Sequence, residues 1–120
     1  MNFKMMTTDE LAKEFEKICL FQDKCIDLGK TSEYNRSIDR MLSLFQELRG
    51  RTTDQRAALS TFYAHRNPQV RLQAAMETLA IFPDRARKVL QTISDRNEYP
   101  QAADARGIMR ALDEGRFVPD

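Results

Sequence analysis

The side chains most often used in acid–base and nucleophilic chemistry are sparse in this chain of 120 residues. His65 is its one histidine, and it stands in a turn-like stretch before Arg66 and Asn67, with no nucleophile or carboxylate among its sequence neighbours. A histidine that acts as a catalytic base needs such a group within hydrogen-bond reach. We therefore predict that His65 fills a turn or places a charge at a helix C-terminus.

The two cysteines, Cys19 and Cys25, are six positions apart in a stretch that has helical periodicity. On one helix they cannot form a disulfide without breaking the helix, and they lack the short spacing of a zinc site. We predict two reduced thiols in the hydrophobic core of a cytoplasmic protein.

The carboxylates are scattered, and the pairs Glu10/Glu14 and Asp113/Glu114 fall where solvated helix faces or helix ends are expected. There is no Glu-x-x-His repeat for a metal-binding helical bundle, no glycine-rich phosphate loop and no serine in a nucleophile elbow. The sequence therefore predicts no enzyme activity, no metal site and no cofactor.

The elements that would position these residues all have helical patterns. No run of alternating β-branched residues indicates a strand. Gly29, Gly50 and Gly115 stand where helices should end, and Thr7 with Glu10 has the spacing of a capping box. We predict one helical-repeat domain over residues 1–120, with tails at 1–7 and 116–120. Its expected helices span residues 8–28, 32–49, 53–65, 67–83, 84–95 and 100–114.

The stretch "NPQVRLQAAMETLAIFP" at 67–83 carries apolar residues on two faces of its helix. Asn67 is a good N-cap, and Pro68 is a good first-turn residue. A short helix with two apolar faces must be covered on two sides, as the inner helix of a solenoid is. A shift of 33 residues also aligns this helix with the last one, bringing Leu72 onto Ala105 and Leu79 onto Leu112. This spacing indicates a helical repeat.

This stretch resembles the HEAT-repeat pattern P-x-V-R-x-x-A-A-x-x-L, through Pro68, Val70, Arg71, Ala74, Ala75 and, one position later than the pattern has it, Leu79. The whole chain also resembles a family of short bacterial HEAT-like proteins, the domain of unknown function number twenty-nineteen. The resemblance covers roughly residues 8–119, and its segments are "YNRSIDRM", "HRNPQVRLQAAMETLA", "PDRARKVLQTI" and "ALDEGRFVP". It implies an all-α, HEAT-like α-α superhelix of about six helices in antiparallel pairs. Related small proteins are suspected to be immunity partners of bacterial toxins.

Two groups of residues are predicted to contact a partner. The start of the second helix combines Tyr34, Asn35, Arg36 and Arg40, and Tyr and Arg are the residue types that anchor interfaces. The alternative is a solvated helix start with ordinary charge pairs. The second group would line the concave face of the repeats, and its members are Arg71, Glu77, Asp104 and Arg110.

Arg71 also has a structural interpretation, because the arginine at this place in HEAT-like repeats usually bonds to neighbouring repeats or to the turn inside its own repeat. The shift of 33 residues places Asp104 at the equivalent point of the next repeat. We predict that Arg71 and Asp104 form an ion pair.

The formal net charge of +1 argues against a nucleic-acid binder that relies on bulk charge. No segment approaches the ~20 apolar residues of a membrane span. We therefore predict a non-catalytic protein-binding module in the cytoplasm, with another protein as its partner, and an immunity protein with a toxin partner as the specific form that the resemblance suggests. The alternatives are a nucleic-acid-associated protein that uses its arginines, or an enzyme of unknown type. Monomer and homodimer both stay open.

Overall fold

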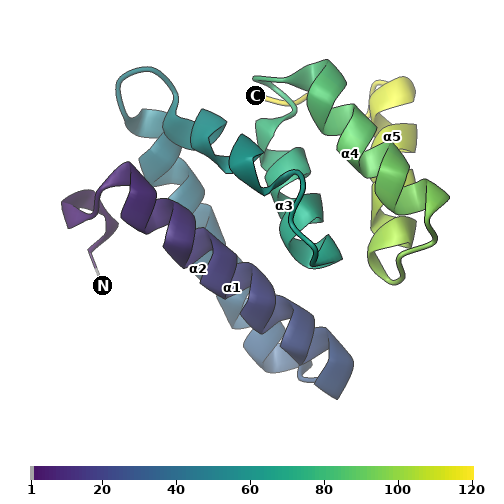
Figure 1. Cartoon of the computed structure of the whole chain (residues 1–120), viewed down its shortest axis with the longest axis horizontal. Coiled ribbons are helices and arrows are strands. Elements are labelled where there is room, and N and C mark those ends of the chain that lie inside the picture. Colours follow the sequence, from purple (N-terminus) through teal and green to yellow (C-terminus); the bar gives the residue numbers. More distant parts are fainter. Residues whose placement is uncertain (1) are drawn as a thin grey trace. The chain divides into compact units, whose positions relative to one another are not determined.

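The computed structural model describes residues 2–120, and every regular element in that range is helical (Figure 1). This confirms the all-α fold class. In chain order the elements are η1 (Phe3–Met5), α1 (Thr8–Leu28), α2 (Thr31–Gly50), η2 (Gln55–Phe62), α3 (Pro68–Thr78), α4 (Pro83–Asp95) and α5 (Gln101–Asp113), where η marks a 3-10 helix.

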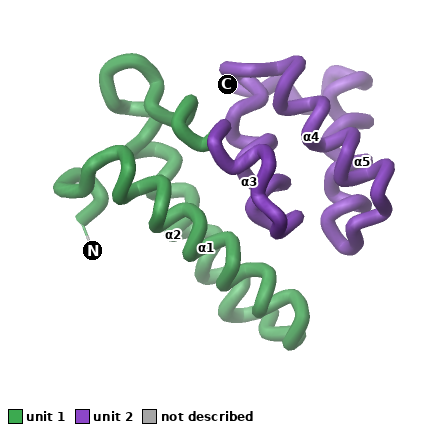
Figure 2. The backbone as a smooth tube through the Cα atoms, in the orientation of Figure 1, with its two compact units in different colours: residues 1–59 green, residues 60–120 purple. Residues whose placement is uncertain are grey.

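The chain divides into two compact units, unit 1 at residues 1–59 and unit 2 at residues 60–120 (Figure 2). Unit 1 is built around the packed pair α1 and α2, with η1 against α2. In unit 2, α4 packs against both α3 and α5, and α3 also contacts α5.

Helix α1 has the bounds that its capping residues predict. The Thr7 hydroxyl accepts from the backbone N–H of Glu10, and the Glu10 carboxylate accepts from the N–H of Thr7. The same hydrogen bonds hold the pKa of Glu10 below its usual range. Gly29 ends the helix at φ +67°, a left-handed conformation that glycine adopts without steric cost. The two cysteines are free and buried, as predicted, and burial raises the pKa of the Cys19 thiol.

The buried face of α2 is rotated from the predicted one. Met41, Phe45 and Leu48 are buried as expected, but Ile38 and Leu42 are exposed at 39% and 53%. The face includes Leu44 and the small polar Ser37 in their place. The prediction failed here because an apolar residue on the flank of a helical stripe can be assigned to the core or to solvent equally well.

The segment after α2 is helical but tighter than predicted. Residues 53–65 were expected to form an α-helix, and the structure has the 3-10 helix η2 at Gln55–Phe62. Its apolar side chains recur every three to four residues, a spacing that fits both kinds of helix. Thr53 precedes η2 at φ +53°, outside the helical region, and Asp54 accepts from the backbone N–H of Arg56.

Helix α3 is covered on more than one side, as its two apolar faces predicted. Asn67 caps it through hydrogen bonds from the N–H groups of Gln69 and Val70, and Pro68 opens its first turn. Its buried residues occupy most of its circumference: Gln69, Val70, Arg71, Leu72, Ala74, Ala75 and Thr78. The helix ends at Thr78 and not near residue 83. The N–H groups of Ile81 and Phe82 both bond to the Thr78 carbonyl in the turn that follows, and Pro83 opens α4.

Helices α3, α4 and α5 share one hydrophobic core. Leu72, Ala75 and Leu79 meet Leu90 and Ile93 of α4 in this cluster, which also contains Ala86, Ala102, Ala105 and Met109. Phe117 packs against the cluster from beyond the end of α5. The side-chain amide of Gln101 donates to Oε1 of Gln69 at 3.0 Å, so the first turns of α5 and α3 are joined by a fully buried hydrogen bond.

Across residues 2–120, no helix is both long and apolar enough to cross a membrane. Nor does that range contain a group of three or more histidine, cysteine, aspartate or glutamate side chains placed to hold a metal ion.

Candidate partner-binding site

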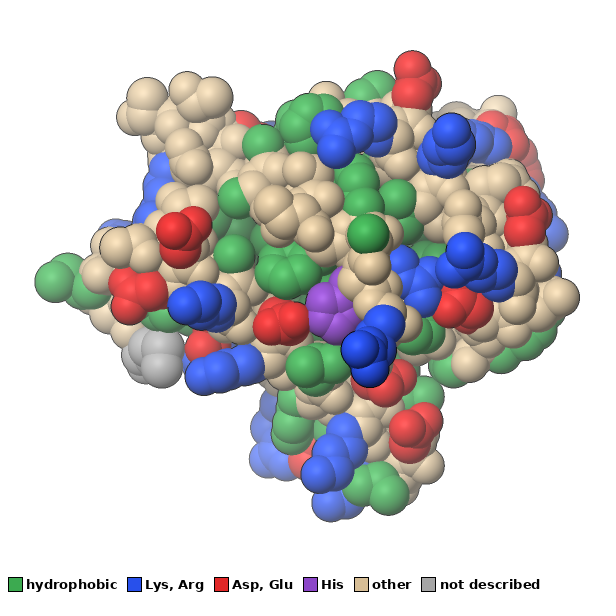
Figure 3. Space-filling model, in the orientation of Figure 1, with side chains coloured by type: hydrophobic (Ala, Val, Ile, Leu, Met, Phe, Trp, Pro, Cys, Tyr) green, Lys and Arg blue, Asp and Glu red, His purple; other side chains and the backbone are tan. Residues whose placement is uncertain are grey.

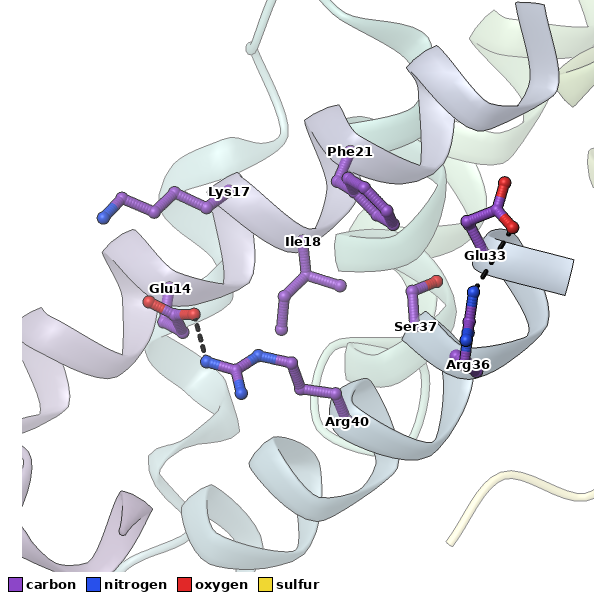
Figure 4. A pocket seen from close by; sticks show the side chains of 8 residues that line it. All are labelled: Glu14, Lys17, Ile18, Phe21, Glu33, Arg36, Ser37 and Arg40. Carbon is purple, nitrogen blue, oxygen red and sulfur yellow. Dashed lines mark hydrogen bonds and ion pairs between the residues drawn. The ribbon is translucent and has the colours of Figure 1, made fainter. Parts of the chain in front are cut away.

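A pocket of about 500 Å³ lies between α1 and α2 in unit 1, and we refer to it as the α1–α2 groove (Figure 4). Each helix supplies four of its lining residues. Those of α1 are Glu14, Lys17, Ile18 and Phe21, and those of α2 are Glu33, Arg36, Ser37 and Arg40. Helical periodicity explains the set, since residues three, four and seven apart share one face.

The floor of the α1–α2 groove is apolar. Ile18 is buried, whereas Phe21 is 48% exposed although it is a large aromatic residue. Beside them Ser37 is buried and fully engaged, because its hydroxyl donates to the carbonyl of Tyr34 and accepts from the buried amide of Gln22. The Ser37 hydroxyl is thus hydrogen-bonded within the α1–α2 pair, and Phe21 presents apolar surface to solvent.

The rim of the groove is charged and mostly paired. Arg40 reaches across from α2 to Glu14 at 2.5 Å, and Arg36 pairs with Glu33 on its own helix at 3.3 Å. Figure 4 shows Lys17 extending toward the end of the groove where Glu14 lies, away from the Arg36–Glu33 pair. The Arg36–Glu33 pair is exposed, and exposed pairs stabilise a fold by about 0–1 kcal/mol, so this pair can exchange partners at an interface with little loss.

The guanidinium of Arg40 has a second contact in unit 1. It lies over the ring of Phe3, with 5.2 Å between the central guanidinium carbon and the ring centroid. Arg51 fixes the same N-terminal segment, because it donates to the carbonyls of Phe3 and Met6 and pairs with Glu47 at 2.9 Å. Arg40 is therefore held between an aromatic ring and a carboxylate.

The structure separates the predicted contact residues into two sets. Arg36 and Arg40 line the α1–α2 groove, but Asn35 lies outside its lining and Tyr34 is half-buried beside it. The other predicted residues belong to unit 2, where Arg110 and Asp104 are exposed and Glu77 is half-buried.

Arg71 is buried, and its ion-pair partner is not the predicted one. Its guanidinium bonds to both carboxylate oxygens of Glu98, at 2.7 and 2.6 Å. It also donates to the backbone carbonyls of His65 and Arg66. The predicted pair of Arg71 with Asp104 is wrong, because the turn between α4 and α5 places Glu98, and not Asp104, at the guanidinium.

The environment of His65 agrees with its predicted turn role. Its Nδ1 accepts a hydrogen bond from the backbone N–H of Asn67 at 3.0 Å, and its carbonyl accepts from Arg71. Both contacts stabilise the turn that leads into α3.

Sequence reasoning missed the α1 side of the groove. Glu14, Lys17 and Phe21 recur at spacings of three and four residues, so they form a line beside the apolar stripe of α1. A phenylalanine in such a flanking line, next to charges of both signs, is the signal that could have indicated this surface.

A family model described as "Domain of unknown function (DUF2019)" matches residues 9–113. The chain belongs to this family. The resemblance carried by the sequence segments is thereby confirmed. The DUF2019 chain is also similar to the protein RPA1889 from Rhodopseudomonas palustris CGA009, whose crystal structure has been solved. The two are 38% identical with a TM-score of 0.97, over 100% of this chain and 99% of that one. None of the curated proteins matches this DUF2019 chain.

Proposed function

We propose that this DUF2019 protein is a non-catalytic protein-binding module and that the α1–α2 groove is its contact surface. The observation that carries the proposal is the position of Phe21, which is half-exposed on the floor of a 500 Å³ pocket with charged residues around it. An aromatic centre with a polar rim is the composition typical of protein interfaces.

The charges of the groove indicate the chemistry of the partner. Lys17, Arg36 and Arg40 face two carboxylates, Glu14 and Glu33, and both carboxylates already form ion pairs. The groove therefore has one positive charge in excess, at the Lys17 end. A partner segment that places an apolar side chain over Phe21 and a carboxylate near Lys17 would complement both features.

The HEAT-like superhelix belongs to the same proposal. It is supported by the helical repeat of the sequence and by the packing in unit 2, where α3 is buried around most of its circumference. An immunity protein with a toxin as partner is the specific form of this function that the family resemblance suggested.

Capture of a partner from lysate tests the groove when two matched variants are compared with the unaltered protein. Phe21→Glu places a charge on the groove floor, and Leu20→Glu makes the same change one residue away, at a side chain of similar exposure outside the groove lining. We expect a partner whose recovery falls at least about tenfold with Phe21→Glu, the loss of an aromatic interface anchor. Equal recovery with all three proteins would refute the groove as the contact surface.

A further inference from the structure

A second pocket, of about 700 Å³, lies entirely within unit 2, and we refer to it as the basic pocket. It is lined by the turn before α3, by one face of α4 and by the turn after α4. Five of its lining residues are cationic at neutral pH: Arg66, Arg71, Arg85, Lys88 and Arg96. Several basic side chains lie near the histidine on the face that Figure 3 shows.

Helix α4 supplies the basic face by its periodicity. Arg85 and Lys88 are three residues apart in α4, and Arg96, eight residues further on, is the C-cap of this helix. This spacing places all three on one side of the helix. Val89 and Thr92 complete this side and also line the basic pocket. The opposite flank of α4 differs, because Arg87 there pairs with Asp113 at 2.8 Å. Positive charge is thus concentrated on the side that faces the pocket, although the formal net charge of the whole chain is only +1.

One carboxylate, that of Glu98, lines the basic pocket, and Arg71 already neutralises it. The hydrogen bonds from Arg71 hold the pKa of Glu98 below its usual range, so this pair remains charged but balanced. Arg66, Lys88, Arg85 and Arg96 are then left as four excess positive charges. All four side chains belong to residues that are exposed to solvent.

Part of this site is fixed in place before any ligand arrives. The Arg85 guanidinium lies over two aromatic rings, 5.4 Å from the centroid of Tyr63 and 4.7 Å from that of Phe82. Arg71 holds the carbonyls of His65 and Arg66 and so fixes the turn that carries the Arg66 side chain. A cationic site whose walls are held in this way loses less conformational entropy on binding than one made of free surface side chains.

We propose that the basic pocket binds a small ligand that carries several phosphate groups. A volume of 700 Å³ is within the range of small-molecule sites, which is about 300–1,000 Å³. Arginine recognises phosphate through two parallel hydrogen bonds, and three of the four excess charges are arginines. Three or four negative charges on one ligand match the four positive charges of the pocket.

A nucleic-acid strand fits the same pocket less well. Proteins that hold single strands combine a basic groove with aromatic side chains on which successive bases stack. The rings that line this pocket are those of Tyr63 and His65. Arg85 already lies over the Tyr63 ring, and the His65 ring lies beside Phe62, with 6.1 Å between the ring centroids. Phosphate groups, and not bases, are therefore the part of a ligand that this pocket can recognise.

Calorimetric titration of the full chain with inorganic tripolyphosphate tests the proposal, at low salt because phosphate contacts weaken steeply as salt rises. The variant K88E/R96E reverses two charges of the pocket. The matched control K24E/R110E makes the same two reversals at exposed side chains outside its lining, one in each unit, and changes the net charge equally. Because the four substituted side chains are exposed, circular dichroism should show an unchanged helical fold in both variants.

We expect saturable binding of one tripolyphosphate per chain, weakened at least about tenfold in K88E/R96E and by less than about twofold in K24E/R110E. Absence of saturable binding, or an equal loss in both variants, would overturn the proposal. A single-stranded oligonucleotide that binds more tightly than tripolyphosphate, and is lost in K88E/R96E, would overturn the assignment to a small ligand.

Discussion

Arg71 and Glu98 form a two-pronged ion pair in which Nη1 donates to Oε1 at 2.7 Å and Nη2 donates to Oε2 at 2.6 Å. The pair joins α3 to the turn between α4 and α5, and the same guanidinium donates to carbonyls of the turn before α3. One side chain thus ties together three segments of unit 2. Bidentate pairs between arginine and carboxylate are among the strongest polar contacts in proteins.

Replacement of Arg71 by alanine should be strongly destabilising. The change leaves the half-buried Glu98 carboxylate and two backbone carbonyls without this donor, and the loss of charge-assisted hydrogen bonds at such a site costs about 1.5–3 kcal/mol. Urea unfolding followed by circular dichroism measures this loss. Arg110→Ala is the matched control, because Arg110 is exposed, and its effect should stay within about 0.5 kcal/mol. Equal stabilities of the two variants would contradict the structural role of Arg71.

The same pair should make stability depend on pH. The hydrogen bonds from Arg71 lower the folded-state pKa of Glu98 below its ordinary value of 4.5. A carboxylate with a lowered folded-state pKa stabilises the protein above its unfolded-state pKa, and this contribution is lost as the pH falls through the folded-state value. We therefore expect the free energy of unfolding to decrease as the pH falls below about 4.5.

Glu98→Gln isolates the contribution of this carboxylate from those of Asp54 and Asp113, whose pKa values are lowered by Arg56 and Arg87. The variant should be less stable than the unaltered protein at neutral pH, and the difference should shrink as the pH falls below 4.5. A difference that stays constant over this range would show that protonation of Glu98 is not linked to folding.

Gly107 offers a stabilising substitution. It lies inside α5, and a Cβ added there would meet no atom within 4 Å. Because alanine has a higher helix propensity than glycine, Gly107→Ala should raise the free energy of unfolding by about 0.5–1 kcal/mol. The urea midpoint measures this gain.

Gly29→Ala is the contrasting variant. Its added Cβ would also meet open space, but its φ of +67° is left-handed, and an alanine there should lower stability by about 1 kcal/mol. If both alanines changed stability in the same direction, backbone conformation would not be the deciding factor.

How much of this fold the sequence predicts depends on the kind of signal. The bounds of α1 follow from local chemistry, because Thr7, Glu10 and Gly29 act on backbone groups within a few residues of themselves. The partner of Arg71 does not follow from local chemistry. The repeat alignment predicted Asp104 because it relates positions on equivalent helices only. Glu98 lies in a turn, and the path of a turn is set by the packing of α4 and α5.

The candidate sites were predicted less completely than the fold, for a similar reason. The α2 side of the groove was indicated by Arg36 and Arg40, but its α1 side is visible only once the two helices are paired. The basic side of α4 is visible in the sequence, because Arg85, Lys88 and the C-cap Arg96 have helical spacing. The periodicity of apolar residues does not indicate it, since that periodicity marks only the face toward the core.

We propose that a partner protein lies over Phe21. Photo-crosslinking measures this directly when a benzoylphenylalanine replaces Phe21 in one variant and Leu20 in a second, with illumination in the source cells. We expect a crosslinked protein of defined mass from position 21 and none from position 20, because Phe21 lines the groove and Leu20 does not. Equal crosslinking from both positions, or from neither, would refute the α1–α2 groove as the contact surface.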